Sequence, residues 1–231
     1  MLIMQSNLFN RDTSNSVNKP LADKLRPESL DEFIGQEELV GDDGVIRKLI
    51  EKDMIPSMIF WGPPGVGKTT LARIIANDTK SKFIQLSAVT SGKKDLQSVI
   101  KQAKEISQFN KERKTILFID EIHRFNKAQQ DYLLPFVENG TIILIGATTE
   151  NPSFEVISPL LSRSRIFTLE RHTSQDLKKI LNRAVVYLEK KQKINLNFEK
   201  GAKKFLIIKS NGDPRTLLNA LEISLNILRK A

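Results

Sequence analysis

Short apolar runs alternate along residues 57–170 with stretches in which apolar residues recur at helical spacing. The apolar runs predict five strands, over residues 57–61, 82–87, 115–120, 141–148 and 165–170. The stretches of helical spacing predict helices over residues 68–78, 93–106 and 127–139. Strands that are apolar throughout and separated by helices are typical of a parallel sheet covered on both faces. We therefore predict an α/β fold with a five-stranded parallel sheet between helices.

The pattern changes after residue 170, where only helical spacing follows. It predicts helices over residues 174–191, 197–210 and 213–230. The stretch "SNGDP" ends one helix and begins the next, with Asp213 as N-cap and Pro214 at the first helical position. The first 19 residues are polar after Phe9 and are typical of a flexible tail. We expect a tail (1–19), an α/β domain (20–170) and a small all-helical domain (171–231).

The amino-acid composition limits the cellular setting of the protein and the kinds of partner that it can bind. The chain has 231 residues, 40% of them hydrophobic, and no cysteine. This excludes disulfides and cysteine-bound metals and favours an intracellular setting. The sequence contains neither a membrane-spanning apolar run nor a signal peptide. A balance of 36 basic against 27 acidic residues gives a net charge of +9, which favours acidic partners: nucleic acid, nucleotides or an anionic membrane face.

The stretch "GPPGVGKTT" follows a predicted strand, opens a predicted helix and matches the phosphate-binding loop G-x-x-x-x-G-K-[ST]. Its glycines let backbone N–H groups approach phosphates, and the helix N-terminus adds partial positive charge. Lys68 would bridge the phosphates, and the Thr69 hydroxyl would bind Mg²⁺. The expected nucleotide-binding residues of this loop are Gly62, Pro63, Pro64, Gly65, Val66, Gly67, Lys68, Thr69 and Thr70.

Two carboxylates follow the apolar run of "TILFIDEIH", at the carboxyl end of a strand, where α/β sheets bind ligands. Asp120 would hold Mg²⁺ through water, and Glu121 would polarise the attacking water as a general base. We interpret His123 as a structural or DNA-facing residue rather than as a catalytic base.

With these motifs the sequence resembles the AAA+ ATPases of the clamp-loader and RuvB-like branch, from about residue 20 onward. "LADKLRPESLDEFIGQEELVG" resembles the segment that contacts adenine in this branch, with Arg26 retained and Lys24 where an arginine is usual. The stretch from "DEIHRFNKAQQD" through "ENPSFEV" to "SRSRIF" is more specific to one family. It resembles the RarA/MgsA family, which includes the Werner helicase-interacting protein. The resemblance implies an AAA+ P-loop fold with a helical lid, and ATP and Mg²⁺ as ligands.

The resemblance also implies roles for residues outside the two motifs. Thr149 falls at the sensor 1 position, with Thr148 as the neighbouring candidate. "GDPRTLLN" resembles sensor 2, in which Arg215 reaches the γ-phosphate. In "SRSR", Arg163 aligns best with an arginine finger that faces a neighbouring subunit's nucleotide, and Arg165 is the second candidate.

A finger that acts on a neighbour makes hydrolysis depend on a homo-oligomer. Family members carry a further C-terminal helical domain that mediates tetramer formation, and we expect this chain to stop before it. We therefore expect ATP hydrolysis only in an assembly.

Two segments are candidates for partner contacts. Gly92, Lys93 and Lys94 follow the second strand, at a place that faces the central channel of AAA+ rings, and would contact DNA phosphates. In the tail, "QSNLF" (Gln5–Phe9) resembles the peptide that docks on the bacterial sliding clamp.

These expectations combine into a DNA-dependent ATPase that acts in bacterial DNA replication, recombination and repair at stalled forks or gaps. Its expected location is the cytoplasm, on the nucleoid. Two alternatives stay open: a clamp-loader subunit or Holliday-junction branch-migration motor, and a scaffold that binds ATP and DNA without hydrolysis.

Overall fold

The computed structural model describes residues 19–110, 113–193 and 195–228. The predicted tail, apart from Lys19, and the segment Gln5–Phe9 that resembles a clamp-binding peptide lie outside these residues. Five strands are present: β1 (Ser57–Trp61), β2 (Lys82–Ser87), β3 (Thr115–Asp120), β4 (Ile143–Thr148) and β5 (Ser164–Thr168). The longer helices are α4 (Lys68–Asp78), α5 (Lys93–Phe109), α6 (Lys127–Glu138), α9 (Ser174–Gln192), α10 (Ala202–Lys209) and α11 (Pro214–Leu228). The short ones are α1 (Leu21–Lys24), α2 (Glu37–Val40), α3 (Val45–Glu51), η1 (Ile122–Arg124), α7 (Pro152–Glu155) and α8 (Ser158–Ser162).

The described strands form one parallel five-stranded sheet in the order β2-β3-β4-β1-β5, which confirms the predicted architecture. Strand β1 lies between β4 and β5, so that Ile59 pairs with Gly146 on one side and Ile166 on the other. Because all strands run in the same direction, the residues that follow β1, β3 and β4 meet at one edge of the sheet. This edge is where the phosphate loop and the acidic pair come together.

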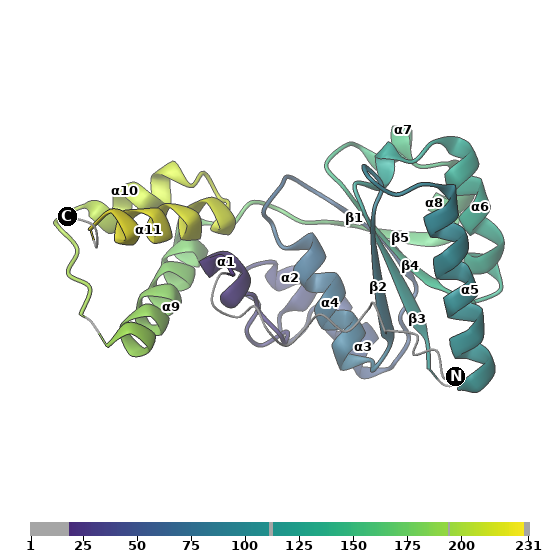
Figure 1. The fold of residues 1–231 in the computed structure, drawn as a ribbon, viewed down its shortest axis with the longest axis horizontal. Helices are drawn as coiled ribbons and strands as arrows, with labels where there is room; N and C mark the ends of the chain where they lie inside the picture. The colour runs from purple at the N-terminus through teal and green to yellow at the C-terminus, as the bar shows by residue number, and fades with distance from the viewer. Residues whose placement is uncertain (1–18, 111–112, 194, 229–231) are drawn as a thin grey trace, which may run out of the picture.

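Helices cover both faces of the sheet (Figure 1). One core joins α4 to the sheet, with Leu71, Ile74 and Ile75 packed against Phe60 and Phe118. The other core lies beneath α5, α6 and α8. Strand side chains therefore meet apolar neighbours on both sides, which explains the uninterrupted apolar runs of the sequence.

The three C-terminal helices form a unit at the other end of the molecule, on the left of Figure 1. They share a core of their own, to which α9 contributes Leu177 and Leu181 and α11 contributes Leu217 and Leu221. Leu21 of α1 belongs to the same core, and its backbone N–H donates to Glu222 of α11. We call α9, α10 and α11 the helical unit. Among the described residues, no helix is both long and apolar enough to cross a membrane.

The structure corrects some predicted bounds. The helix expected over residues 197–210 begins only at Ala202, because Gly201 adopts φ +90°, which a helix interior does not allow. The strand expected from residue 141 begins at Ile143. The predicted cap of α11 is confirmed: Pro214 is its first residue, and Asp213 Oδ1 accepts a hydrogen bond from the backbone N–H of Arg215. The short helices were not predicted, because so few residues show no period.

Candidate nucleotide-binding site

A cleft of about 200 Å³ opens where the sheet edge meets the helical unit. Three parts of the chain line it: the segment before β1, the loops that follow β1 and β3, and residues of the helical unit. The lining residues are Ala22, Asp23, Leu25, Arg26, Pro27, Glu32, Phe33, Ile34, Pro64, Gly65, Val66, Gly67, Lys68, Thr69, Thr70, Asp120, Glu121, His172, Ile180, Arg183, Pro214, Arg215 and Leu218. Most of the predicted nucleotide-binding residues are therefore in one place.

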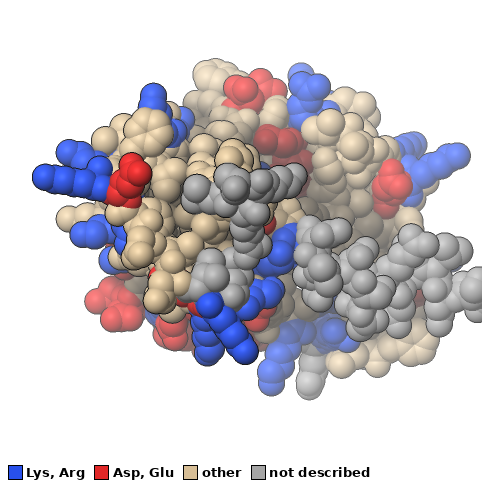
Figure 2. Space-filling model, turned by 60° about the vertical axis from the view of Figure 1, so that its left-hand side comes forward, with Lys and Arg blue, Asp and Glu red and all other residues tan. Residues whose placement is uncertain are grey.

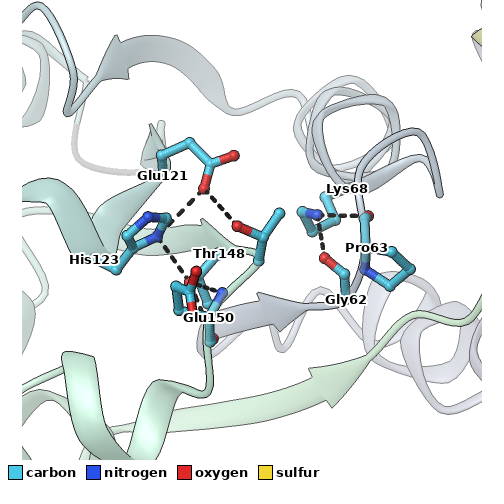
Figure 3. A network of polar contacts seen from close by, with 8 residues as sticks. Gly62, Pro63, Lys68, Glu121, His123, Thr148 and Glu150 are labelled. Carbon is cyan, nitrogen blue, oxygen red and sulfur yellow. Dashed lines mark hydrogen bonds and ion pairs between the residues drawn. The ribbon is translucent and has the colours of Figure 1, made fainter.

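Lys68 is the first residue of α4, and its side chain lies back along the phosphate loop. Its ammonium Nζ donates to the carbonyl oxygens of Gly62 (2.6 Å) and Pro63 (2.9 Å) (Figure 3). Lys68 is buried, and burial lowers its pKa below the usual range, while the carboxylates of Glu121 and Asp120 act in the opposite direction. A buried cation at a helix N-terminus, beside backbone N–H groups, is suited to bind phosphate.

Two glycines of the loop are required by close approaches. A Cβ atom on Gly62 would lie 2.1 Å from the carbonyl oxygen of Leu169. Gly65 has φ +81°, and a Cβ atom there would lie 2.1 Å from Oδ1 of Asp213, the N-cap of α11. The helical unit thus contacts the phosphate loop directly. Packing therefore requires glycine at both positions.

The acidic pair follows β3. Burial raises the pKa of Asp120, the negative charge of Glu121 raises it further, and Lys68 and Arg215 lower it. Glu121 has φ +54°, in the left-handed region, which is uncommon for residues other than glycine. This conformation is strained, so the surrounding structure must hold it in place. Residues held in this way are common at functional sites.

Glu121, His123 and Thr148 form one polar network (Figure 3). Oε2 of Glu121 accepts a long hydrogen bond of 3.4 Å from the hydroxyl of Thr149 and lies 3.3 Å from Nδ1 of His123. The same Nδ1 lies 3.0 Å from the hydroxyl of Thr148, which also donates to the carbonyl oxygen of Glu150. Thr148 is fully buried at the end of β4, whereas Thr149 follows it and contacts the acid.

The arginines expected at the site divide into two groups. Arg26 and Arg215 line the cleft, and Arg26 forms an ion pair with Asp23. Arg163 and Arg165 are not among the lining residues. Arg163 is exposed at the end of α8, where it pairs with Glu138 and donates to the carbonyl oxygen of Pro159. Arg165 lies exposed in β5.

Sequence reasoning missed much of the apolar half of the cleft. Phe33 and Ile34 fall within the segment that resembles an adenine contact, so a signal for them existed. Leu218 falls within "GDPRTLLN", the stretch that resembles sensor 2, whereas His172 and Ile180 carry no comparable signal, because each lies in an ordinary helical or connecting stretch. The packing of the helical unit on the sheet edge brings them to the cleft.

The cleft fits a divalent cation. Thr69 and Asp120 both line it, and hydroxyl and carboxylate oxygens are the ligands that Mg²⁺ prefers. Burial raises the pKa of the half-buried Asp120, so a cation bound beside it would offset the cost of its charge.

Comparison with known proteins identifies the family to which a chain with this site belongs. A family model of the "ATPase family associated with various cellular activities (AAA)" matches residues 58–174, half of the chain. These residues run from β1 to the start of α9 and contain the phosphate loop and the acidic pair. The chain belongs to the AAA family of ATPases.

Similar proteins indicate to which branch of the AAA family the chain belongs. Replication-associated recombination protein A of Haemophilus influenzae is 46% identical over 220 residues, and the match covers 95% of this chain and 49% of that protein. The protein of the same name in Escherichia coli K12 is 45% identical over 218 residues, covering 92% and 47%. ATPase WRNIP1 of Dictyostelium discoideum is 47% identical over 206 residues, covering 89% and 23%. The predicted resemblance to the RarA/MgsA family is confirmed, and the chain spans about half the length of these two bacterial relatives.

Solved structures agree with this assignment. The Thermotoga maritima RuvB Holliday junction branch migration motor matches with a TM-score of 0.66 at 32% identity, over 84% of this chain and 63% of that one. The predicted AAA+ fold is thereby confirmed as well.

Proposed function

We propose that this chain is the ATP-hydrolysing part of a DNA-dependent ATPase that acts in replication, recombination and repair, at stalled forks or gaps. The observation that carries the proposal is the convergence of Lys68, Asp120, Glu121 and Arg215 on one cleft. The names of the relatives, replication-associated recombination protein A and ATPase WRNIP1, support the biological setting.

Each residue has a place in the proposed reaction. The phosphate loop and Lys68 bind the β- and γ-phosphates of ATP, while Phe33, Ile34 and Leu218 offer an apolar surface to the base. Thr69 and Asp120 hold Mg²⁺, which neutralises phosphate charge when bound. Glu121 takes a proton from the attacking water, and Thr149 positions the carboxylate of Glu121 through its hydroxyl. Arg215 stabilises charge on the γ-phosphate from α11.

The assembly is part of the proposal. Arg163 lies outside the cleft of its own chain, on an exposed edge, and a guanidinium there can reach the γ-phosphate of a neighbouring subunit. Residues 20–170 act as the ATPase domain and 171–231 as the lid that carries Arg215, with residues 1–19 as a tail. We place the protein in the cytoplasm, on the nucleoid, with the sliding clamp as a partner of Gln5–Phe9.

One alternative keeps support of its own. The similarity to the RuvB structures favours a branch-migration motor as the second candidate. A scaffold that binds ATP without hydrolysis is disfavoured, because Glu121, Thr149 and Arg215 are all present.

Steady-state ATP hydrolysis measured against protein concentration, with and without duplex DNA that has single-stranded ends, tests the proposal. We expect specific activity to rise with both protein and DNA, and Lys68→Ala to abolish it. Hydrolysis that DNA never stimulates contradicts the proposal. Stimulation by a four-way junction alone favours the branch-migration motor.

A further inference from the structure

The positive charge of the chain is unevenly distributed. Residues 1–170 contain 22 basic and 22 acidic residues, a net charge of zero. Residues 171–231 contain 14 basic and 5 acidic residues, a net charge of +9. The whole formal charge of the chain therefore lies in the helical unit and its flanking residues. Solubility alone would not require the net positive charge to be concentrated in one part of the chain.

These charges lie on the surface and are mostly not neutralised. The exposed lysines of the helical unit and of the segment that joins α9 to α10 are Lys178, Lys179, Lys190, Lys191, Lys193, Lys200, Lys203, Lys204 and Lys209. Within the described part of the chain, none of these nine makes an ion pair, whereas Arg183 pairs with Glu32. Figure 2 brings this end of the molecule forward and shows basic side chains along its left-hand edge and lower rim, with acidic ones between them.

Aromatic rings are interleaved with the lysines. Nζ of Lys203 lies 4.8 Å from the ring centroid of Phe198, and Nζ of Lys209 lies 5.7 Å from that of Phe205. Phe205 is 61% exposed, so its ring is accessible to a ligand. Helical spacing puts Lys204, Phe205, Ile208 and Lys209 on the outward face of α10.

A surface hollow lies beside the ring of Phe198. It is lined by Leu196, Asn197, Phe198, Glu199 and Gly201 from the segment before α10, and by Lys203 and Lys204 from the helix itself. We call Phe198, Lys203, Lys204, Phe205 and Lys209 the α10 face. It combines a shallow groove, unpaired cations and an exposed ring.

We propose that the α10 face binds single-stranded DNA, with its lysines on the phosphates and Phe205 stacked on a base. Positively charged grooves with aromatic platforms are the common device for binding single strands without sequence preference. The exposed ring favours single strands over duplex, since bases in a duplex are already stacked on one another.

The observations favour DNA over a membrane surface. On α10, the exposed apolar residues Phe205 and Ile208 lie between Lys204 and Lys209, and the helix has eight residues. Interfacial helices need a broad apolar face that enters the lipid, which this helix does not offer.

The site also offers a route from DNA to ATP hydrolysis. Leu206 and Ile207 of α10 pack on the same core as Leu217 and Leu218 of α11, the helix that carries Arg215. A strand bound to the α10 face therefore holds the element that positions Arg215 at the cleft. This step rests on the proposed function, whereas binding to the strand does not.

Fluorescence anisotropy with labelled oligothymidylate and with a matched duplex tests the site. The charge-reversal variant Lys203→Glu/Lys204→Glu/Lys209→Glu should weaken oligothymidylate binding and reduce the slope of log K against log[salt] by about 2, at roughly 0.7 for each phosphate contact. Phe205→Ala should weaken single-strand binding about 5- to 150-fold and leave duplex binding unchanged. The control Lys52→Glu/Lys80→Glu/Lys101→Glu makes the same charge change on exposed lysines of the α/β domain.

The outcomes separate this proposal from the proposed function. Loss of binding in the helical variants but not in the control supports the α10 face. Equal loss in both, or wild-type binding in both, overturns it, and DNA-stimulated hydrolysis then stands on another surface. Wild-type binding of oligothymidylate by the helical variants, together with their loss of binding to phosphatidylserine vesicles, replaces the DNA site by a membrane site. A wild-type chain that hydrolyses ATP but neither binds DNA nor responds to it overturns the proposed function as well.

Discussion

Arg163 forms an ion pair with Glu138 of its own chain, with 2.6 Å between Nη2 and Oε1. Both side chains are about two-fifths exposed, at 41% and 42%. Exposed ion pairs of this kind contribute roughly 0–1 kcal/mol to stability, so a stronger anion can displace the carboxylate. In the proposed assembly, the γ-phosphate of a neighbouring subunit would be such an anion. Glu138 therefore gives Arg163 a weak partner in its own chain and leaves it available to a second one.

Replacing this arginine should separate binding from hydrolysis. Arg163→Ala should leave ATP affinity unchanged and reduce hydrolysis by about 10³–10⁵, because it removes charge stabilisation that only the transition state needs. Arg165→Ala is the matched control, and Glu138→Gln should not reduce hydrolysis. A reversed result, with Arg165→Ala inactive and Arg163→Ala active, would make Arg165 the finger.

The proposed general base can be tested in the same assay. Glu121→Gln keeps the shape of the side chain but not its basicity, so it should lower the hydrolysis rate by roughly 10²–10⁴ while ATP still binds. Thr149→Val removes the hydroxyl 3.4 Å from Glu121 and should lower the rate less. Thr149→Ser retains a hydroxyl and should stay close to wild type. Equal defects in both Thr149 variants would mean that its methyl group matters rather than its hydroxyl.

The contact between the phosphate loop and the helical unit predicts an unequal cost for two similar substitutions. Gly65 and Gly140 both have positive φ, +81° and +71°, and an alanine in this region costs about 1–2 kcal/mol. Around Gly140 a Cβ atom has no neighbour within 4 Å, whereas at Gly65 it meets Asp213. Gly65→Ala should therefore destabilise the fold more than Gly140→Ala in urea unfolding, and it alone should weaken ATP binding. Equal destabilisation with intact ATP binding would contradict the contact.

The charge of Asp120 should make the folded protein less stable at neutral pH. Its pKa in the folded state is raised above the usual value of 3.8, chiefly by burial, so the folded protein binds more protons than the unfolded chain between these two values. Stability must then fall as pH rises through that window. Asp120→Asn removes this cost and should be more stable than wild type at pH 7, with the difference shrinking as pH falls through that window and disappearing below 3.8. Thermal unfolding of both proteins across this range measures the effect. A difference independent of pH would assign it to packing instead.

His172 should make stability depend on pH in the opposite direction. Burial lowers its pKa below 6.5, whereas the carboxylate of Asp176 and the contact of Nε2 with the carbonyl oxygen of Ile34 (3.1 Å) act in the opposite direction. The unfolded chain therefore binds more protons below pH 6.5, and stability is lost as pH falls through the folded pKa.

The two histidines of the chain allow a clean comparison. His172→Leu should remove most of the loss of stability between pH 7 and 5, and His123→Gln should retain it. Thermal unfolding at several pH values measures both. The same pH dependence in His172→Leu and wild type would show that another group titrates.

The sequence alone determined the sheet, the phosphate loop and the acidic pair. Strands buried on both faces must be apolar throughout, and a loop that binds phosphate must contain glycine and lysine at fixed spacing, so "GPPGVGKTT" and "TILFID" could be read without coordinates. These signals are local, because each depends on neighbours within about ten residues. The resemblance to a family then predicted which arginines and threonines to examine.

Only the tertiary structure decided how the rest of the site is assembled. His172, Ile180 and Leu218 reach the cleft because the helical unit packs on the sheet edge, and Arg163 finds Glu138 because α8 lies against α6. Glu138 lies 25 residues before Arg163, and nothing in the pattern of apolar residues indicates that the two side chains meet. Contacts between distant residues are set by how the cores pack, and apolar periodicity does not encode which polar side chains that packing brings together.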